Sequence, residues 1–364
     1  MDEAALHDLL SGQRRDLRAR ILRGALSMAS WGYTLATGLR NSAYEQGWLP
    51  IHRASVPVIS LGNITTGGTG KTPTAAWLAN WLLAQGVRPG LLSRGYRSLQ
   101  PDPQGMAPAG NDEKLVLDRL CPFVPHLQQR DRVTSAERLV REFDCNVLIL
   151  DDGFQHRRLH RDLDLVLIDA LQPWGFRHVL PRGLLRESIK GIQRASLVLL
   201  TRSDQCSAGD KQRLREELRS LRGSDACVEV AFVPTRLVSV DGQEASLHSI
   251  IGQRAYSFCG IGNPGGFRQT LATVGVSTEL QVFPDHHHYG PADLRELQSR
   301  SRAAGVQLVL TTLKDLVKIP PDGWSGPPLF AVEIGVRFEA GEQLLVNQIR
   351  QAVWPSQQTS FDSK

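Results

Sequence analysis

A glycine-rich turn between an apolar strand and a helix constrains the fold of this 364-residue chain more than any other feature. Residues 59–75 read ISLGNITTGGTGKTPTA and continue an apolar run that begins at Val56. Strand, glycine turn and helix in this order bind phosphate, because backbone N–H groups and the helix N-terminus converge on one anion. We therefore expect an α/β fold with a P-loop NTPase-like, doubly wound and mainly parallel sheet.

The residues of this loop have separate expected roles. Lys71 would neutralise phosphate oxygens, and the Thr72 hydroxyl would bind Mg²⁺. The sequence departs from G-x-x-x-x-G-K-[ST] at the first glycine, and the later glycines supply the missing flexibility. A glycine-rich turn without a ligand is the alternative, which the strand before and the helix after make less favourable. The expected nucleotide-binding residues are Thr65, Thr66, Gly67, Gly68, Thr69, Gly70, Lys71 and Thr72.

A second element of the same kind of site follows further along the chain. The apolar run 146–150 (NVLIL) leads directly into Asp151 and Asp152. A carboxylate at the end of a buried strand is what a P-loop site needs to hold Mg²⁺ beside the loop threonine. A strand followed by aspartate is a weak signal alone, but the upstream loop strengthens it.

Two further polar positions lie where expected strands or loops end. Arg94 follows the expected strand 89–93, at the edge where open α/β sheets bind ligands. It is a candidate for phosphate or substrate contact, with a surface arginine as the equal alternative. Asp112 stands just before the expected helix 114–120. The pattern alone favours a helix cap there over a contact to a substrate hydroxyl.

The histidine run at 286–288 follows an expected strand, 280–283. Adjacent side chains on an extended chain point to opposite faces, so at most two of these imidazoles share a metal ion. Acid–base chemistry is a better use, because an imidazole titrates near working pH. Basic stretches at 155–161 and 181–187 are either solvated surface or sites for anionic groups.

The N-terminal segment predicts a helix with an arginine-rich part and an apolar stripe. It is too short and too polar to span a bilayer comfortably. Such a helix either lies in the headgroup region of anionic lipid or packs on the protein's own core, and the segment alone leaves both open. The stripe comprises Leu17, Ile21, Gly24, Met28, Trp31 and Leu35.

Charge and cysteine content exclude several classes of protein. The chain has 42 Lys and Arg against 37 Asp and Glu, and a net charge of +5 is not typical of a nucleic-acid binder. The five cysteines are scattered and include no C-x-x-C pair, which argues against a zinc site or a disulfide framework and for a reducing compartment. The length suits two domains.

Other functions remain open on the residues alone. Thr201-Arg202-Ser203-Asp204 follows an apolar strand and superficially matches the guanine-reading N/T-K-x-D motif of GTPases. A GTP-dependent switch or metallochaperone is therefore the main alternative. A non-catalytic membrane adaptor would use only the N-terminal helix and would leave the phosphate loop unexplained.

The motifs, taken in order, resemble the tetraacyldisaccharide 4'-kinase family, which phosphorylates a membrane-borne acylated disaccharide in the lipid A pathway. The resemblance runs from about residue 20 to residue 340. Thr65 suits the loop of this family, whereas Leu313 stands where the family usually has glutamate. The matching stretches are residues 35–47, GNITTGGTGKTP, LLSRGYRS, NDEKLVL, RDR, LDDGFQHRRLHRDLDLVLIDA, LPRGLLRE, FCGIGNP, FPDHHHY and TTLKD.

The resemblance implies ATP-dependent phosphorylation of the 4'-hydroxyl of a tetraacyldisaccharide 1-phosphate, with ATP and Mg²⁺ as cofactors. The implied catalytic residues are Lys71 and a base dyad, Asp112 and His286. The implied metal ligands are Thr72, Asp151 and Asp152, with Glu187 as an additional candidate. Candidate substrate or phosphate contacts are Arg94, Arg132, His156, Arg182 and Arg186.

The resemblance also implies an organisation and a location. Residues 1–50 form a membrane-docking segment, 51–236 the P-loop domain, 237–338 a smaller α/β domain joined by a two-stranded linker, and 339–364 a closing helix and tail. Pairing of the dyad across the two domains is expected to need closure. The implied partners are the lipid substrate and the cytoplasmic face of the inner membrane, bound peripherally or monotopically. Nothing in the sequence points to nucleic acid or an obligate protein partner.

Overall fold

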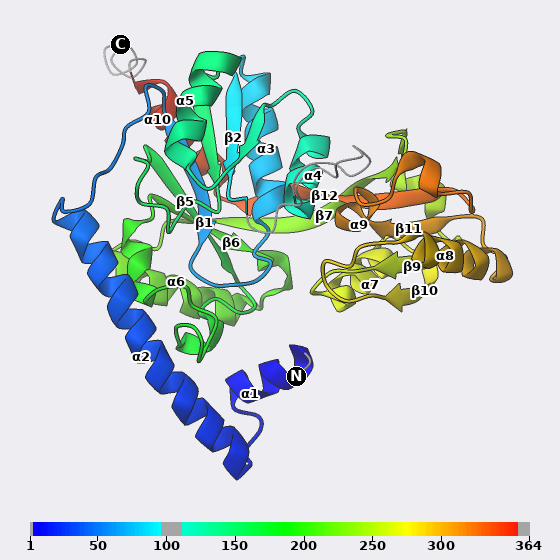
Figure 1. The fold of residues 1–364 in the computed structure, drawn as a ribbon, viewed down its shortest axis with the longest axis horizontal. Helices are drawn as coiled ribbons and strands as arrows, with labels where there is room; N and C mark the ends of the chain where they lie inside the picture. Colours follow the sequence, from blue (N-terminus) through cyan, green and yellow to red (C-terminus); the bar gives the residue numbers. More distant parts are fainter. Residues whose placement is uncertain (1–2, 96–110, 356–364) are drawn as a thin grey trace.

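The computed structural model describes residues 3–95 and 111–355, with side chains from residue 7 onward (Figure 1). Its strands form one sheet in the order β10-β9-β11-β12-β7-β6-β5-β1-β4-β2-β3, with β8 paired to β7. Neighbouring strands are parallel except for the pairs β7–β12 and β7–β8. The expected α/β class with a mainly parallel sheet is therefore confirmed.

The first part of the sheet carries helices on both faces, as in a doubly wound fold. Its strands are β1 (Val58–Asn63), β2 (Pro89–Ser93), β3 (His126–Gln128), β4 (Val147–Asp151), β5 (Leu163–Asp169) and β6 (Leu197–Thr201). Its helices are α3 (Lys71–Ala84), α4 (Asp112–Leu120), α5 (Arg132–Phe143), α6 (Ala208–Arg222) and α10 (Glu342–Val353).

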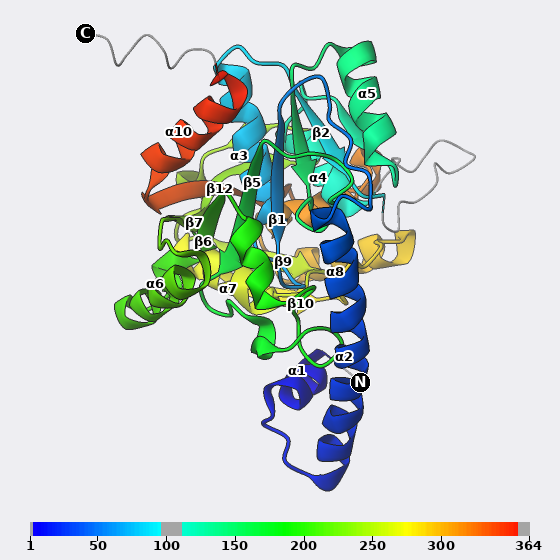
Figure 2. The same ribbon diagram turned by 90° about the vertical axis from the view of Figure 1, so that its left-hand side faces the viewer.

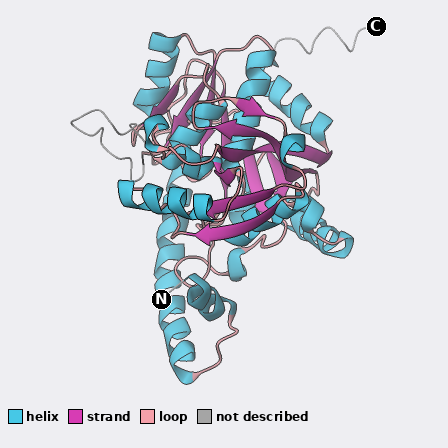
Figure 3. Cartoon of the chain, turned by 90° about the vertical axis from the view of Figure 1, so that its right-hand side faces the viewer, coloured by secondary structure: helices cyan, strands magenta, loops and turns pink. Residues whose placement is uncertain are grey.

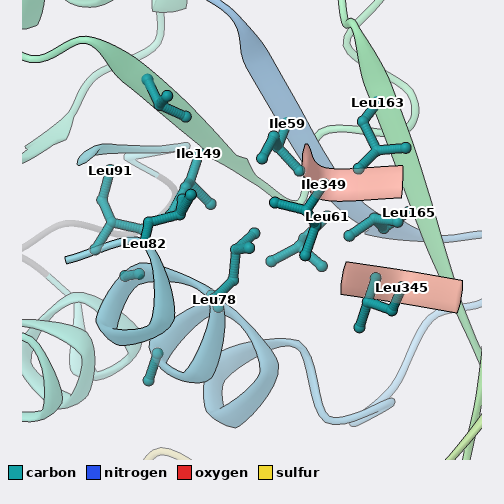
Figure 4. Close-up of a cluster of buried hydrophobic side chains, with 14 of the residues drawn as sticks. Ile59, Leu61, Leu78, Leu82, Leu91, Ile149, Leu163, Leu165, Leu345 and Ile349 are labelled. Atoms are coloured by element: carbon teal, nitrogen blue, oxygen red, sulfur yellow. The ribbon is translucent and has the colours of Figure 1, made fainter. Parts of the chain in front are cut away.

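The strands of this part are buried on both faces, which explains their continuous apolar sequences. Ile59 and Leu61 of β1 pack under α3 and α10 in the cluster shown in Figure 4. On the opposite face, Leu214 and Leu218 of α6 pack against β5 and β6. These two layers fix β1, and with it the phosphate loop that follows β1.

The second part is smaller and has the same strand–helix alternation (Figure 3). Phe267 and Leu271 of α7 cover one face, and Leu294 and Leu297 of α8 cover the other. Its elements are β8 (Glu244–Ala245), β9 (Arg254–Cys259), α7 (Pro264–Thr273), β10 (Ser277–Val282), α8 (Pro291–Ala303), β11 (Val309–Thr312) and α9 (Leu313–Leu316).

Two long antiparallel strands, β7 (Cys227–Ser239) and β12 (Leu329–Ala340), join the two parts. The start of β7 pairs with β6, and the start of β12 pairs with β11. Residues 231–236 and 333–337 between those regions form a two-stranded section, as the family resemblance implies. The proposed domain boundaries at 236/237 and 338/339 thus fall inside these strands.

The N-terminal helices lie against the edge of the first part and project beyond it (Figures 1 and 2). They are α1 (Glu3–Ser11) and the 29-residue α2 (Leu17–Glu45), whose N-cap is Asp16. No helix in the described ranges combines the length and the apolar character that crossing a bilayer requires.

Candidate active site

The phosphate loop connects β1 to α3 and depends on glycine at its last position. Gly70 caps α3 with φ +85°, a conformation that side chains disfavour. A Cβ at this position would lie 1.9 Å from the ring of Phe232 on β7. Thr69 is buried and accepts a hydrogen bond of 3.0 Å from the side-chain amide of Asn63. The positive φ of Gly70 and its close approach to Phe232 therefore both require glycine at the last position of the loop.

A second segment, which we call the strap (residues 179–186), supports the loop from the side. The backbone N–H of Thr66 donates to the carbonyl of Leu184 at 2.7 Å, and the backbone N–H of Arg186 donates to the carbonyl of Ile64. On its other side the strap meets α2, where the Ser30 hydroxyl donates to the carbonyl of Val179 at 2.8 Å. The strap thus links α2 to the phosphate loop.

The acidic pair after β4 consists of two aspartates in unlike surroundings. The Lys71 ammonium lies 3.5 Å from Asp152, and Arg186 donates to both oxygens of Asp152 at 2.8 Å. Although burial opposes ionisation, these cations lower the pKa of Asp152 to about 2. Burial, with the charge of Asp152 beside it, raises the pKa of Asp151 to about 7. Asp151 Oδ1 is buried and accepts no hydrogen bond.

Asp112 and His286 are paired, although they come from different parts of the fold. His286 Nδ1 lies 2.8 Å from Asp112 Oδ2. Asn111 caps α4 by accepting from the backbone N–H of Lys114, so Asp112 does not have the cap role that the sequence pattern favoured. The pair is already assembled in this structure, and its assembly requires no further closure of the two parts.

All of these groups open into one cavity of about 1250 Å³. Loop residues, the acidic pair and the Asp112–His286 pair face a common space, which is what transfer between two bound substrates requires. The sequence-predicted site residues that line it are Thr66, Lys71, Arg94, Asp112, Asp151, Asp152, His156, Arg132, Arg186, Glu187 and His286.

Comparison with known proteins then decides the family. The sequence model of tetraacyldisaccharide-1-P 4'-kinase (LpxK) matches residues 22–353. The chain belongs to this family.

Relatives of the family align along most of the chain. The tetraacyldisaccharide 4'-kinase of Anaeromyxobacter dehalogenans strain 2CP-C is 38% identical over 312 residues, 82% of each chain. That of Anaeromyxobacter sp. strain Fw109-5 is 36% identical over 356 residues, 94% of this chain and 95% of that protein. A crystal structure of the "apo" form of LpxK from Aquifex aeolicus in complex with ATP has a TM-score of 0.72 and 28% identity, covering 92% of this chain and 100% of that one.

Arg132 and the neutral imidazole of His156 form one wall of the cavity. Arg132 is 3% exposed, and burial lowers its pKa although both aspartates of the acidic pair oppose the shift. Burial and the charge of Arg132 lower the pKa of His156 to about 4. Arg132 Nε and His156 Nε2 are buried without a hydrogen-bond partner. This wall is suited to an anionic group of a substrate.

Two residues predicted from the LpxK resemblance lie in structural networks instead. Arg182 does not line the cavity; its guanidinium donates to the carbonyl of Leu10 at 2.7 Å and so anchors α1. Glu187 lines the cavity, but Oε1 accepts from Gln155 and Oε2 from Asn41 and Arg194. These contacts favour an anchoring role over phosphate binding for Arg182 and over metal binding for Glu187.

The remaining predicted residues flank the cavity without lining it. Thr72 is half-buried in the first turn of α3, and Gly67 and Gly68 are exposed at the tip of the loop. Arg202 of the apparent guanine-reading motif binds Asp169 at 2.6 Å and donates to the carbonyl of Gly68. This motif therefore supports the loop through Arg202.

Sequence reasoning missed the two lysines beside the dyad, Lys314 and Lys318. Their ammonium groups lie 3.7 Å and 3.8 Å from Asp112 Oδ2. Lys314 lies in α9 and Lys318 in the turn that follows it, and a spacing of four residues was a usable signal because it puts two side chains on one face of a helical turn. It also missed the cavity-lining face of α2, which carries Tyr33, Thr37, Arg40 and Asn41.

Proposed function

We propose that this member of the family transfers the γ-phosphoryl group of ATP to the 4'-hydroxyl of a tetraacyldisaccharide 1-phosphate, a step of lipid A biosynthesis. The observation that carries the proposal is the shared cavity, which places Lys71 and the acidic pair opposite Asp112 and His286. Phosphoryl transfer needs this arrangement, because its transition state depends on positioning and charge neutralisation.

The loop side of the cavity would hold ATP. The amides of residues 65–72 and Lys71 would bind the β- and γ-phosphates. Mg²⁺ fits the acidic pair because Asp151 presents a buried oxygen without a partner, and Thr72 stands at the start of α3. No group of three His, Cys, Asp or Glu side chains in the described ranges forms a protein-only metal site. One or two carboxylates with substrate phosphates suffice for Mg²⁺, which would neutralise charge developing on the phosphates.

The other side would activate the acceptor. Asp112 would accept the proton of the 4'-hydroxyl as that oxygen attacks phosphorus. His286 donates to the same carboxylate and fixes its direction. Lys314 and His286 lower the pKa of Asp112 against the effect of its burial, so Asp112 is ionised at neutral pH and ready to act as base.

Helix α2 would bring the acylated substrate to the cavity from a membrane surface. Its apolar stripe is exposed: the fractions are 68% for Met28, 76% for Trp31 and 64% for Leu35. An exposed apolar stripe of this kind suits the headgroup region of a bilayer. Tyr33 and Thr37 of the same helix line the cavity, so a lipid bound at α2 would lie beside it. The cytoplasmic face of the inner membrane, which the family resemblance implies, is the proposed location.

The direct test supplies purified protein with ATP, Mg²⁺ and a tetraacyldisaccharide 1-phosphate in detergent micelles. The expected product is heavier by one phosphate and is detected by mass spectrometry. Parallel reactions with GTP and without lipid distinguish the alternative switch, which would hydrolyse GTP without the disaccharide. Failure to phosphorylate the lipid under conditions where ATP binds would refute the proposal.

A further inference from the structure

The Asp112–His286 pair rests on a buried ion pair in the second part of the fold. Asp315 is fully buried, and its Oδ1 lies 3.1 Å from the ammonium of Lys318. Its other oxygen accepts from the backbone N–H of Gly260 at 3.0 Å and from the Thr312 hydroxyl at 2.6 Å. A buried carboxylate with this many donors is held in one position.

Asp315 reaches both members of the dyad through its partners. The Lys318 ammonium lies 3.8 Å from Asp112 Oδ2. Gly260, whose N–H donates to Asp315, accepts with its carbonyl from the backbone N–H of His286 at 3.1 Å. His286 has φ +61°, a conformation that a non-glycine residue keeps only when its surroundings enforce it. One buried carboxylate thus supports the base and its histidine.

Apolar packing sets the distance between α4 and this ion pair. Val116 of α4 belongs to the same buried cluster as Leu313 and Leu316 of α9. Leu313 occupies the position where the sequence departs from the family's usual glutamate, and here it is 7% exposed. The cluster joins α4 to the second part and holds Asp112 opposite Lys318.

We infer that Lys318, fixed by Asp315, is a positioning residue that holds Asp112 ionised and correctly oriented for phosphoryl transfer. The inference rests on the proposed function and adds a residue to it. Lys318 is 6% exposed, whereas Lys314 is 26% exposed and is shared with Asp285 at 3.3 Å. Lys314 lies slightly nearer to Asp112 Oδ2 and acts on it as a charge, but Lys318 is the more buried ammonium and is held in place by the buried carboxylate of Asp315.

Other charged groups around Asp112 also influence how its activity depends on pH. The elements packed against it contribute both signs of charge, so only a difference between variants isolates one lysine. These groups are His286 and Asp285 before α8, Lys314, Asp315 and Lys318 at α9, Glu113 and Lys114 on α4, and Arg94 and Arg130 across the cavity.

The test compares Lys318→Met with Lys314→Met and the parent in kcat as a function of pH. Lys318→Met is expected to lower kcat by about tenfold to a hundredfold through misplacement of the base. The acid limb of the profile should move up by about one pH unit, because an opposite charge near Asp112 is lost. Although Lys318 lines the cavity, the KM values for ATP and disaccharide should stay within about twofold if it acts through Asp112. Lys314→Met should also move the acid limb but should lower kcat less, because Lys314 is not fixed by a buried carboxylate.

A double-variant comparison separates positioning from a purely structural role. In an Asp112→Asn background, Lys318→Met should lower kcat no further, because Lys318 acts through Asp112. Lys318→Arg should keep the acid limb in place. If Lys318→Met does not fold, Lys318→Gln replaces it in the same test, because the glutamine amide can still donate a hydrogen bond while the charge is lost. An unshifted profile, or an additional loss in the Asp112→Asn background, would overturn the inference. An inactive parent would instead refute the proposed function.

Discussion

Asp112 presents its two carboxylate oxygens to different surroundings. Oδ2 faces the His286 imidazole and the ammonium groups of Lys314 and Lys318. Within residues 3–95 and 111–355, no hydrogen bond reaches Oδ1. One oxygen is therefore fixed by protein groups, and under the proposed function the other would accept the proton of the acceptor hydroxyl.

Replacement of Asp112 by asparagine is expected to lower kcat by about 10² to 10⁴, because asparagine keeps the shape but cannot take the proton. ATP affinity should be unchanged, since Asp112 lies on the acceptor side of the cavity. Steady-state kinetics and a nucleotide-binding titration check the two parts. Retention of full turnover would exclude Asp112 as the base.

His156 is expected to make folding stability depend on pH. Its pKa falls from 6.5 to about 4 in the folded chain, first through burial and then through the charge of Arg132. Between these values the unfolded chain binds the additional proton, so the free energy of unfolding should decrease as pH falls from 6.5 towards 4.

Chemical denaturation of the parent and of His156→Gln at several pH values measures this effect. Over the same pH interval, the free energy of unfolding should fall less in the variant than in the parent. The slopes of unfolding free energy against pH should differ by at most the contribution of one bound proton. Equal slopes for the two proteins would show that His156 is not held neutral.

At the scale of elements, α2 has two unlike faces, one that contacts the rest of the protein and one that is exposed. Ser30 is buried against the strap, and Tyr33 and Thr37 line the cavity. The stripe through Met28, Trp31 and Leu35 faces solvent. The sequence predicted the stripe but left open whether it packs on the core; the structure places it on the surface.

Replacing Trp31 and Leu35 together by serine is expected to weaken binding to anionic vesicles, because apolar area for insertion is lost. Thermal stability should hardly change, since both side chains are exposed. Phe123→Ser is a matched control, because Phe123 is 84% exposed and lies outside α2. Vesicle sedimentation measures the result. Equal loss of binding in the control, or none in the double variant, would contradict a docking role for the stripe.

At the scale of the whole molecule, the strands β7 and β12 and the Val116–Leu313 cluster connect the two parts. Damage to the smaller part is therefore expected to destabilise the whole chain. Leu297→Ala removes a fully buried side chain of α8 and should cost about 2–5 kcal/mol of unfolding free energy. Denaturation followed by ATP binding and by far-UV circular dichroism should give coincident midpoints. A first part that still binds ATP after the second has unfolded would contradict this coupling.

Local patterns predicted most of the fold. The strand at residues 89–93 and the strand that leads into Asp151 lie where apolar runs put them, because these signals act over few residues. The resemblance predicted the Asp112–His286 pair. The anchoring contacts of Arg182 and Glu187 were not predictable, because their partners are distant in sequence. The helix α1 precedes the part of the chain that the family model matches, and it too was missed.

Through the strap, the N-terminal helix α2 also supports the phosphate loop. Ser30 holds the carbonyl of Val179, and five residues later the carbonyl of Leu184 holds the backbone of the phosphate loop. Deleting the first fifty residues to obtain a protein that is easier to handle would also remove a brace of the nucleotide pocket. Any shortened version designed for crystallisation or screening should therefore retain the helix and change only its outward side chains.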